Sequence, residues 1–188
     1  ERDGLLVSCS CSYHLAPDLI PSYLDAIVRH RVRYLWGYTS SLYALAQAMI
    51  GQRRQDLQMA AVFTNAEPIY DYQRELIREA FRCDVRETYG MAEIVASASE
   101  CEAGGLHLWP CVALLEVMDG DRRAGAGKTG DLIGTGLLNG DMPLIRYRIG
   151  DRGSLATDER CACGRWLPRL ARVEGRSCDT LFTIDGRR

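Results

Sequence analysis

Long apolar runs are missing from this 188-residue sequence: no stretch approaches the roughly 18 uninterrupted apolar residues of a membrane-spanning helix. An excess of charge of one sign is missing as well, because 23 basic and 25 acidic residues are mixed along the chain. Such a balance argues against a surface for nucleic acid or anionic lipid. The opening Glu1-Arg2-Asp3-Gly4 lacks the charged-then-apolar pattern of a secretory signal. We therefore expect a cytoplasmic protein that binds neither nucleic acid nor membranes.

Internal repeats and low-complexity linkers are also absent, and the length suits one domain or slightly more. Apolar residues at helical spacing predict helices over 18–31, 42–50 and 68–82. Thr39, Ser40 and Ser41 are natural caps for the second of these helices, and Pro68 is suited to open the third. Short runs predict strands over 57–64 and 84–88. This succession favours an α/β layered sheet.

After Ser99 the character of the sequence changes, since no long helical period returns. Short strand-like runs separated by Gly, Asp and Asn turns cover 112–118, 130–137, 143–147 and 152–156. The second half is therefore predicted to be mostly β, as a twisted or barrel-like sheet.

Three short blocks of glycine, arginine and carboxylate occur in this order: residues 89–93 read Tyr-Gly-Met-Ala-Glu, 147–151 read Tyr-Arg-Ile-Gly-Asp, and 175–179 read Gly-Arg-Ser-Cys-Asp. Each block alone has an ordinary explanation, because Tyr-Gly is a common turn and Arg148 with Asp151 could be a surface ion pair. Taken in order, the three blocks resemble the nucleotide-handling segments of adenylate-forming acyl–coenzyme A ligases. The nearest resemblance is to the phenylacetate–coenzyme A ligase group and its capsule-biosynthesis relatives.

The resemblance implies roles for particular residues. Glu93 would be catalytic and reach magnesium, and Asp179 would be the hinge about which a small carboxy-terminal domain swings. Asp151 would accept both ribose hydroxyls, which suits the two oxygens of a carboxylate, and Arg176 would contact ribose or phosphate. The remaining nucleotide contacts implied by the resemblance are Ala66, Glu67, Pro68, Tyr89, Gly90 and Met91. ATP or AMP, magnesium and coenzyme A would be the cofactors.

The resemblance further implies a fragment of the large N-terminal domain of such an enzyme. Residues 1–99 would form an α/β subdomain with the nucleotide-binding turn, 100–174 a β-rich subdomain, and 175–188 the hinge and the start of a truncated C-terminal domain. The family's glycine-rich phosphate loop and its late lysine have no counterpart here, and Ala92 stands where Thr or Ser is common. We therefore expect that this chain, by itself, does not catalyse the joining of a carboxylic acid to coenzyme A.

Eight cysteines are many for a reduced compartment, and four residues are candidates for a structural zinc site: Cys101, His107, Cys161 and Cys163. Three thiols and one imidazole make a standard tetrahedral zinc set, and both segments resemble stretches of the phenylacetate ligase group that can bind zinc. The alternative is that these cysteines are buried small hydrophobic residues, as free cysteines often are.

Two functions therefore compete on the sequence alone. The first is an AMP-forming acyl–coenzyme A ligase, of which this chain is an incomplete portion that handles a small carboxylic acid and a nucleotide. The second is a non-catalytic, zinc-stabilised module that binds a nucleotide or a partner protein. A homodimer or a complementing chain would fit either.

Overall fold

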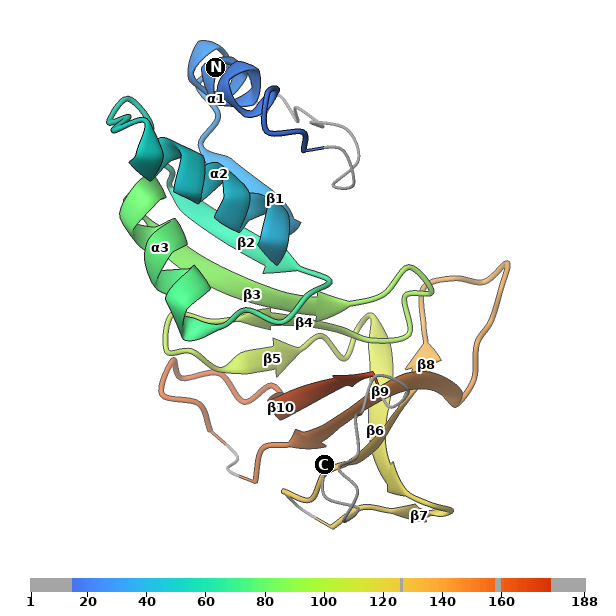
Figure 1. Ribbon diagram of the computed structural model, residues 1–188. Coiled ribbons are helices and arrows are strands. Elements are labelled where there is room, and N and C mark those ends of the chain that lie inside the picture. Colours follow the sequence, from blue (N-terminus) through green and yellow to red (C-terminus); the bar gives the residue numbers. More distant parts are fainter. Residues whose placement is uncertain (1–14, 126, 158–159, 177–188) are drawn as a thin grey trace, which may run out of the picture. The chain divides into compact units, whose positions relative to one another are not determined.

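The computed structural model describes residues 15–125, 127–157 and 160–176 (Figure 1). The described residues form two compact units that meet in the sequence between Glu87 and Thr88. None of the helices in this described part has the length or the apolar character needed to cross a membrane.

The first unit consists of three helices and three parallel strands. Its elements are α1 (Ile20–Arg29), β1 (Tyr34–Tyr38), α2 (Thr39–Gly51), β2 (Ala61–Asn65), α3 (Asp71–Phe81) and the first four residues of β3 (Asp84–Gly90). The strands pair in the order β1-β2-β3, and α2 and α3 lie side by side against them (Figure 1). Its core includes the fully buried Leu24, Met49, Val62, Ile77 and Phe81. The predicted α/β layered sheet is therefore confirmed.

Local details of this unit differ from the sequence-based expectation. Strand β1 was not expected, because its three aromatic side chains are exposed and alternate with half-buried Leu35 and Gly37, so it contains no buried run. Strand β2 begins at Ala61, four residues later than predicted. Pro68 does not open α3; this helix begins at Asp71 after Tyr70, whose N–H donates to the Gln73 side chain at 3.1 Å.

The second unit is an antiparallel sheet, and its described residues contain no helix. Its strands are the end of β3, β4 (Ser97–Glu100), β5 (Leu106–Leu108), β6 (Ala113–Asp119), β7 (Arg122–Arg123), β8 (Gly130–Gly136), β9 (Tyr147–Leu155) and β10 (Arg169–Arg176). They are ordered β3-β4-β5-β10-β9-β8-β6-β7. In Figure 1, β6 and β8 run at a steep angle to β4 and β5, so this sheet is strongly twisted. The predicted β-rich second half is confirmed.

Strand β9 is a single element where two strands were expected, and residues 143–146 do not belong to it. It carries an irregularity, since Arg148 pairs with Ile133 whereas Arg152 pairs with Asp131. Gly150 lies within this bulge with φ of 89°, a conformation that suits glycine. The bulge lies next to Asp151, so it influences the direction in which that side chain points.

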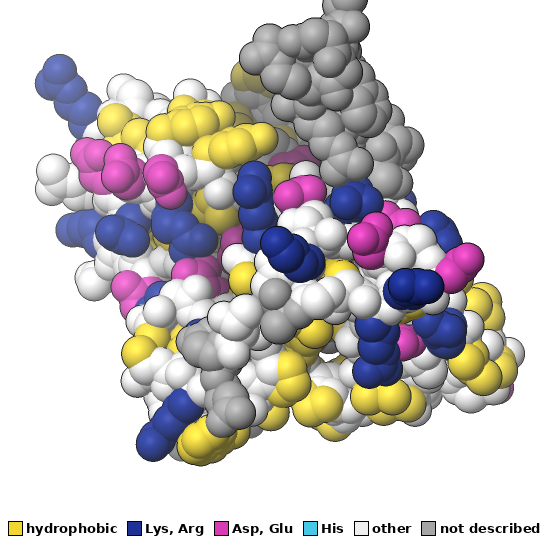
Figure 2. Space-filling model, turned by 90° about the horizontal axis from the view of Figure 1, so that it is seen from below, with side chains coloured by type: hydrophobic (Ala, Val, Ile, Leu, Met, Phe, Trp, Pro, Cys, Tyr) yellow, Lys and Arg dark blue, Asp and Glu magenta, His cyan; other side chains and the backbone are white. Residues whose placement is uncertain are grey.

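The charges of the molecule are mixed in sign on the face shown in Figure 2, where Lys and Arg side chains lie beside Asp and Glu side chains. The second unit contains several ion pairs of opposite charge, such as Arg148 with Asp131 at 2.9 Å and Arg146 with Glu116 at 3.0 Å. Pairs this exposed contribute little to stability, but they prevent a field of one sign.

Candidate functional site

Three residues from the predicted nucleotide blocks meet in the second unit. The hydroxyl of Tyr89, at the end of β3, donates to Asp151 Oδ2 at 2.7 Å. Arg176 Nε lies 3.3 Å from Asp151 Oδ1, because Arg176 on β10 pairs with Asp151 on β9. Both oxygens of one carboxylate are thus held by donors from different strands. The side chain of Asp151 is 14% exposed and that of Arg176 is 58% exposed, so the guanidinium opens to solvent.

The phenol of Tyr89 is a firmly protonated donor. Burial raises its pKa most, and the hydrogen bond to the Asp151 carboxylate raises it further. A neutral hydroxyl can orient the carboxylate without cancelling its charge, so Asp151 keeps its capacity to accept hydrogen bonds from a ligand.

The other predicted carboxylate, Glu93, lies in the turn that follows β3. Tyr147 on β9 donates its hydroxyl to Glu93 Oε1 at 3.3 Å. The turn can pack against β8 because Gly134 has no side chain: a Cβ there would lie 2.2 Å from the carbonyl oxygen of Val95. Glu93 therefore contacts β9 through Tyr147, and Asp151 is itself a residue of that strand.

Tyr147 was not assigned a role from the sequence, although it belongs to the second block. Its only signal was its place four residues before Asp151 in a predicted strand region, which says nothing about Glu93. Asp179, the predicted hinge, lies outside the described residues. A cavity of about 220 Å³ beside Glu116, Arg123 and Lys128 contains none of the predicted residues.

The predicted adenine-side turn of residues 66–68 lies in the first unit, directly after β2. Glu67 accepts two hydrogen bonds from the start of α2, from Ser40 N–H at 2.7 Å and from Ser40 Oγ at 3.0 Å. Thr39 Oγ1 donates to the Glu67 carbonyl at 3.1 Å. The prediction that the hydroxyl residues 39–41 cap α2 was wrong, since the cap position is Tyr38 and the carboxylate of Glu67 accepts the free N–H.

Ala66 in this turn has φ of 63°, the left-handed conformation that costs a residue with a Cβ about 1–2 kcal/mol. The hydrogen bonds of Glu67 hold the turn in this conformation. Because β1 and β2 are parallel, Tyr38 and Asn65 pair at the same edge of the sheet, and carboxyl ends of parallel strands are where α/β sheets bind ligands.

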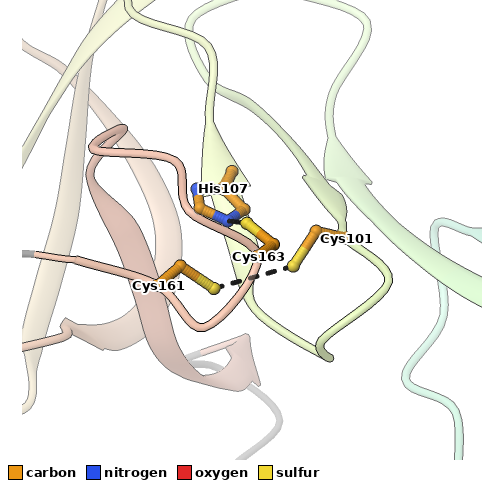
Figure 3. A group of neighbouring side chains, drawn as sticks. All are labelled: Cys101, His107, Cys161 and Cys163. Carbon is orange, nitrogen blue, oxygen red and sulfur yellow. Dashed lines mark hydrogen bonds between the residues drawn. The ribbon is translucent and has the colours of Figure 1, made fainter.

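The four predicted metal ligands converge on one point in the second unit (Figure 3). One donor atom from each of Cys101, His107, Cys161 and Cys163 lies within 4.8 Å of the others. The Sγ atoms of Cys101 and Cys161 are 3.7 Å apart, and Cys163 Sγ is 3.3 Å from His107 Nε2. Tetrahedral zinc with its usual bond lengths requires about 3.8 Å between sulfurs and about 3.5 Å between sulfur and nitrogen. The donor set and its spacing fit zinc.

Two turns of similar hydrogen bonding present these thiols. In the first, Cys101 N–H donates to Gly105 O at 2.9 Å and Gly104 N–H donates to Cys101 O at 3.0 Å. In the second, Cys161 N–H donates to Arg165 O at 3.1 Å and Gly164 N–H to Cys161 O at 2.8 Å. Both turns need a left-handed residue, which Gly104 and Gly164 supply with φ of 77° and 87°.

The surroundings of Cys163 favour metal binding by its thiolate. Burial has the largest influence on the pKa of Cys163 and raises it, but hydrogen bonds from the backbone and side chain of Arg165 and from the neighbouring thiols lower this pKa to about 6. Burial raises the pKa of Cys101. His107 is 2% exposed, and within the described residues its Nδ1 has no hydrogen-bond partner. Its ring is therefore held by the cluster through Nε2.

Comparison with known proteins finds relatives that match most of the chain. The chain is 34% identical to a phenylacetate-coenzyme A ligase of Thermus thermophilus over 138 residues, which is 70% of this chain and 31% of that protein. It is 26% identical to the protein CapK of Staphylococcus aureus over 171 residues, 90% of this chain and 37% of CapK. No family model matches the chain.

A solved structure extends the likeness to the fold. A 2-hydroxyisobutyryl-CoA ligase in an open conformation, in complex with 2-HIB-AMP and CoA, superposes with a TM-score of 0.76 at 26% identity. The superposition covers 91% of this chain and 42% of that one. The chain thus spans about a third of the length of the curated relatives it matches.

Proposed function

We propose, on the premise that this chain belongs to the adenylate-forming ligase superfamily, that it carries the ribose- and metal-binding side of the active site of an AMP-forming acyl–coenzyme A ligase. The observation that carries this proposal is the meeting of Tyr89, Asp151 and Arg176. Each of the three predicted blocks contributes one of these residues. Tyr89 and Arg176 hold the nearly buried carboxylate of Asp151.

Asp151 is the residue that would grip the nucleoside. A carboxylate has about four acceptor positions, and Tyr89 and Arg176 use two of them. The remaining positions can accept the two neighbouring hydroxyls of a ribose. Tyr89 and Arg176 restrict the rotation of the carboxylate, so less entropy is lost when the ribose binds. The exposed guanidinium of Arg176 would also contact a ribose oxygen or a phosphate.

Glu93 is the residue that would hold magnesium, with Tyr147 orienting its carboxylate. A bound magnesium ion would neutralise charge on the phosphates of ATP. The chain's own contribution is to hold this carboxylate through Tyr147 on β9, the strand that also carries Asp151, so that the phosphate and ribose ends of one nucleotide can be held together. Gly90 and Met91 are proposed to flank adenine, and the assignment of Ala66, Glu67 and Pro68 to adenine stays a prediction from the sequence.

The reaction proposed for the whole enzyme is the conversion of a carboxylic acid, ATP and coenzyme A into acyl–coenzyme A, AMP and pyrophosphate. The 2-hydroxyisobutyryl-CoA ligase in complex with 2-HIB-AMP and CoA is consistent with this class of chemistry in a relative. We expect that the isolated 188-residue chain does not turn over. Steady release of pyrophosphate from ATP, magnesium and a panel of aryl and fatty acids would contradict this expectation.

A structural zinc ion is part of the same proposal, with Cys101, His107, Cys161 and Cys163 as its ligands. Zinc here would be closed to chemistry, because four protein ligands complete its tetrahedron. The cluster also favours the second candidate function, a zinc-stabilised module without catalysis that binds a nucleotide or a partner. The two candidates differ in whether Asp151 is needed for nucleotide binding.

Calorimetric titration of the zinc-loaded chain with AMP tests the proposal. Weak binding that is lost in Asp151→Ala supports the ligase site. Asp119→Ala is the matched control, because Asp119 is an exposed carboxylate on β6 of the same unit. Zinc-loaded protein that does not bind AMP, or that binds it equally well after Asp151→Ala, would contradict the proposed nucleotide site. A cytoplasmic location stays a prediction.

A further inference from the structure

The strands that carry the nucleotide-binding residues are connected through the strands that carry the Cys/His cluster. Tyr89 on β3 pairs with Ala98 on β4, and the next residue of β4, Ser99, pairs with His107 on β5. His107 pairs in turn with Arg169 on β10, and the far end of β10 pairs Arg176 with Asp151 on β9. The path from Tyr89 to Asp151 across the sheet therefore passes through His107.

The weakest step of this path is the pairing of β5 with β10. Only two residue pairs join these strands, whereas β3–β4 and β4–β5 have three each and β9–β10 has five. One further hydrogen bond, from Leu108 N–H to Pro168 O at 2.8 Å, extends the contact. So short a pairing offers few backbone hydrogen bonds to fix its register, and a slip of one residue would turn every side chain of β10 to the opposite face.

The Cys/His cluster spans this β5–β10 seam. Cys101 and His107 come from the turn before β5 and from β5 itself, and Cys161 and Cys163 come from the turn before β10 (Figure 3). An ion pair between Glu102 and Arg165 at 2.9 Å also joins the two turns, but both side chains are exposed, and such pairs contribute little to stability. The cluster thus cross-links this seam through four side chains.

We propose that metal binding at Cys101, His107, Cys161 and Cys163 controls nucleotide affinity, because it fixes the register of β10 against β5 and so places Arg176 and Asp151 beside Tyr89. The cluster is then a positioning site for the nucleotide, beyond a structural support for its own two turns. This inference rests on the proposed nucleotide site. Its physical consequence is reciprocal: if zinc raises the affinity for AMP, then AMP raises the affinity for zinc by the same factor.

The reciprocal effect can be measured on the zinc-loaded chain, without preparing a metal-free form. Zinc affinity is determined by equilibrium competition with a chelator, in the presence and absence of saturating AMP. We expect AMP to raise the zinc affinity about fivefold or more, within the usual range of coupling between sites. In Asp151→Ala this increase should disappear, and the same measurement corrects for zinc bound by free AMP.

A cysteine outside the cluster provides the second control. Cys111 is exposed and free, and Cys111→Ser should keep both the zinc affinity and its response to AMP. If calorimetry detects AMP binding but AMP leaves the zinc affinity unchanged, the proposed coupling is contradicted and the proposed nucleotide site is supported. If zinc-loaded wild-type protein does not bind AMP at all, both the proposed nucleotide site and the proposed coupling are contradicted. A purely structural zinc ion would not respond to AMP, so the response separates the two roles.

Discussion

The two units of this chain are stabilised in different ways. Fourteen described residues form the buried core of the first unit and eight form that of the second, so less apolar burial holds the second together. Both cores combine large side chains such as Phe81 and Leu132 with alanines, so the difference lies in the number of buried residues. The second unit compensates with side-chain contacts between strands, among them the Cys/His cluster and the hydrogen bonds of Asp151.

This difference also separates scaffold from chemistry. In the first unit the one predicted site carboxylate, Glu67, is engaged by the start of α2. In the second unit the predicted carboxylates Glu93 and Asp151 are held by tyrosine hydroxyls and remain able to accept ligands. A sheet with a small core can carry polar sites of this kind, provided that cross-links replace the missing packing. Four predictions test this comparison.

The largest effect is expected from removal of the metal. Cys161→Ser should abolish tight zinc binding, and because a structural zinc ion contributes on the order of 10 kcal/mol to small metal-stabilised folds, the second unit should lose most of its stability. The first unit should be unaffected. Hydrogen exchange followed peptide by peptide distinguishes the units. Cys83→Ser, which removes a thiol from the first unit, is the control, and equal exchange of both variants in β5 and β10 would contradict the comparison.

The converse experiment removes packing from the first unit. Phe81 is completely buried at the end of α3, so Phe81→Ala should lower the free energy of unfolding of this unit by about 3–5 kcal/mol. Chemical denaturation with zinc present provides the measurement. Zinc content should not change, and loss of zinc along with the first unit would show that the two units do not differ as proposed.

A matched pair of glycine substitutions sharpens the contrast further. A Cβ at Gly105 would lie 2.9 Å from Cys161 Sγ and 3.4 Å from Cys101 Sγ, so Gly105→Ala should weaken zinc binding by roughly 1–3 kcal/mol. Among the described residues, no atom lies within 4 Å of a Cβ placed at Gly51 in α2, so Gly51→Ala should be tolerated. Chelator competition measures both. Unchanged zinc affinity in Gly105→Ala would mean that the thiols are not packed around an ion.

The smallest effect is expected at the strained turn of the first unit. Ala66→Gly relieves the left-handed conformation and should raise the free energy of unfolding by about 0.5–1 kcal/mol. Ala48→Gly within α2 should lower it by roughly 1 kcal/mol, since glycine weakens a helix interior. Denaturation midpoints of the two variants should therefore shift in opposite directions. Shifts in the same direction would show that the turn is not strained.

Much of the fold followed from local pattern. The three helices of the first unit were predicted because their apolar residues recur at helical spacing, and the β-rich second half because that spacing disappears after Ser99. Strand β1 was missed, since Tyr34 and Trp36 are largely exposed and its pattern is not that of a buried run. Strand β10 was missed for a related reason: Arg169, Arg172 and Arg176 interrupt its apolar residues, and one of its two partners, β5, lies far away in the sequence.

The site shows the same division. The residue types and the order of the three blocks identified Asp151, Arg176 and Glu93 as candidates, and the choice of Cys101, His107, Cys161 and Cys163 needed only their chemistry and the resemblance. The assignment of Tyr147 to Glu93, and of Ser40 to Glu67, required coordinates. Both contacts join residues more than twenty-five positions apart. A local pattern carries no information about such partners.

By itself, the sequence determined which side chains this protein has available for binding a nucleotide and a metal, because a carboxylate, a guanidinium or a thiol brings its chemistry wherever it lies. Only the tertiary structure decided that Tyr89 meets Asp151 and that the two cysteine turns face each other across β5 and β10. Those meetings depend on strand order and register. Register is set by the summed packing and hydrogen bonding of whole strands, which no short stretch of residues encodes.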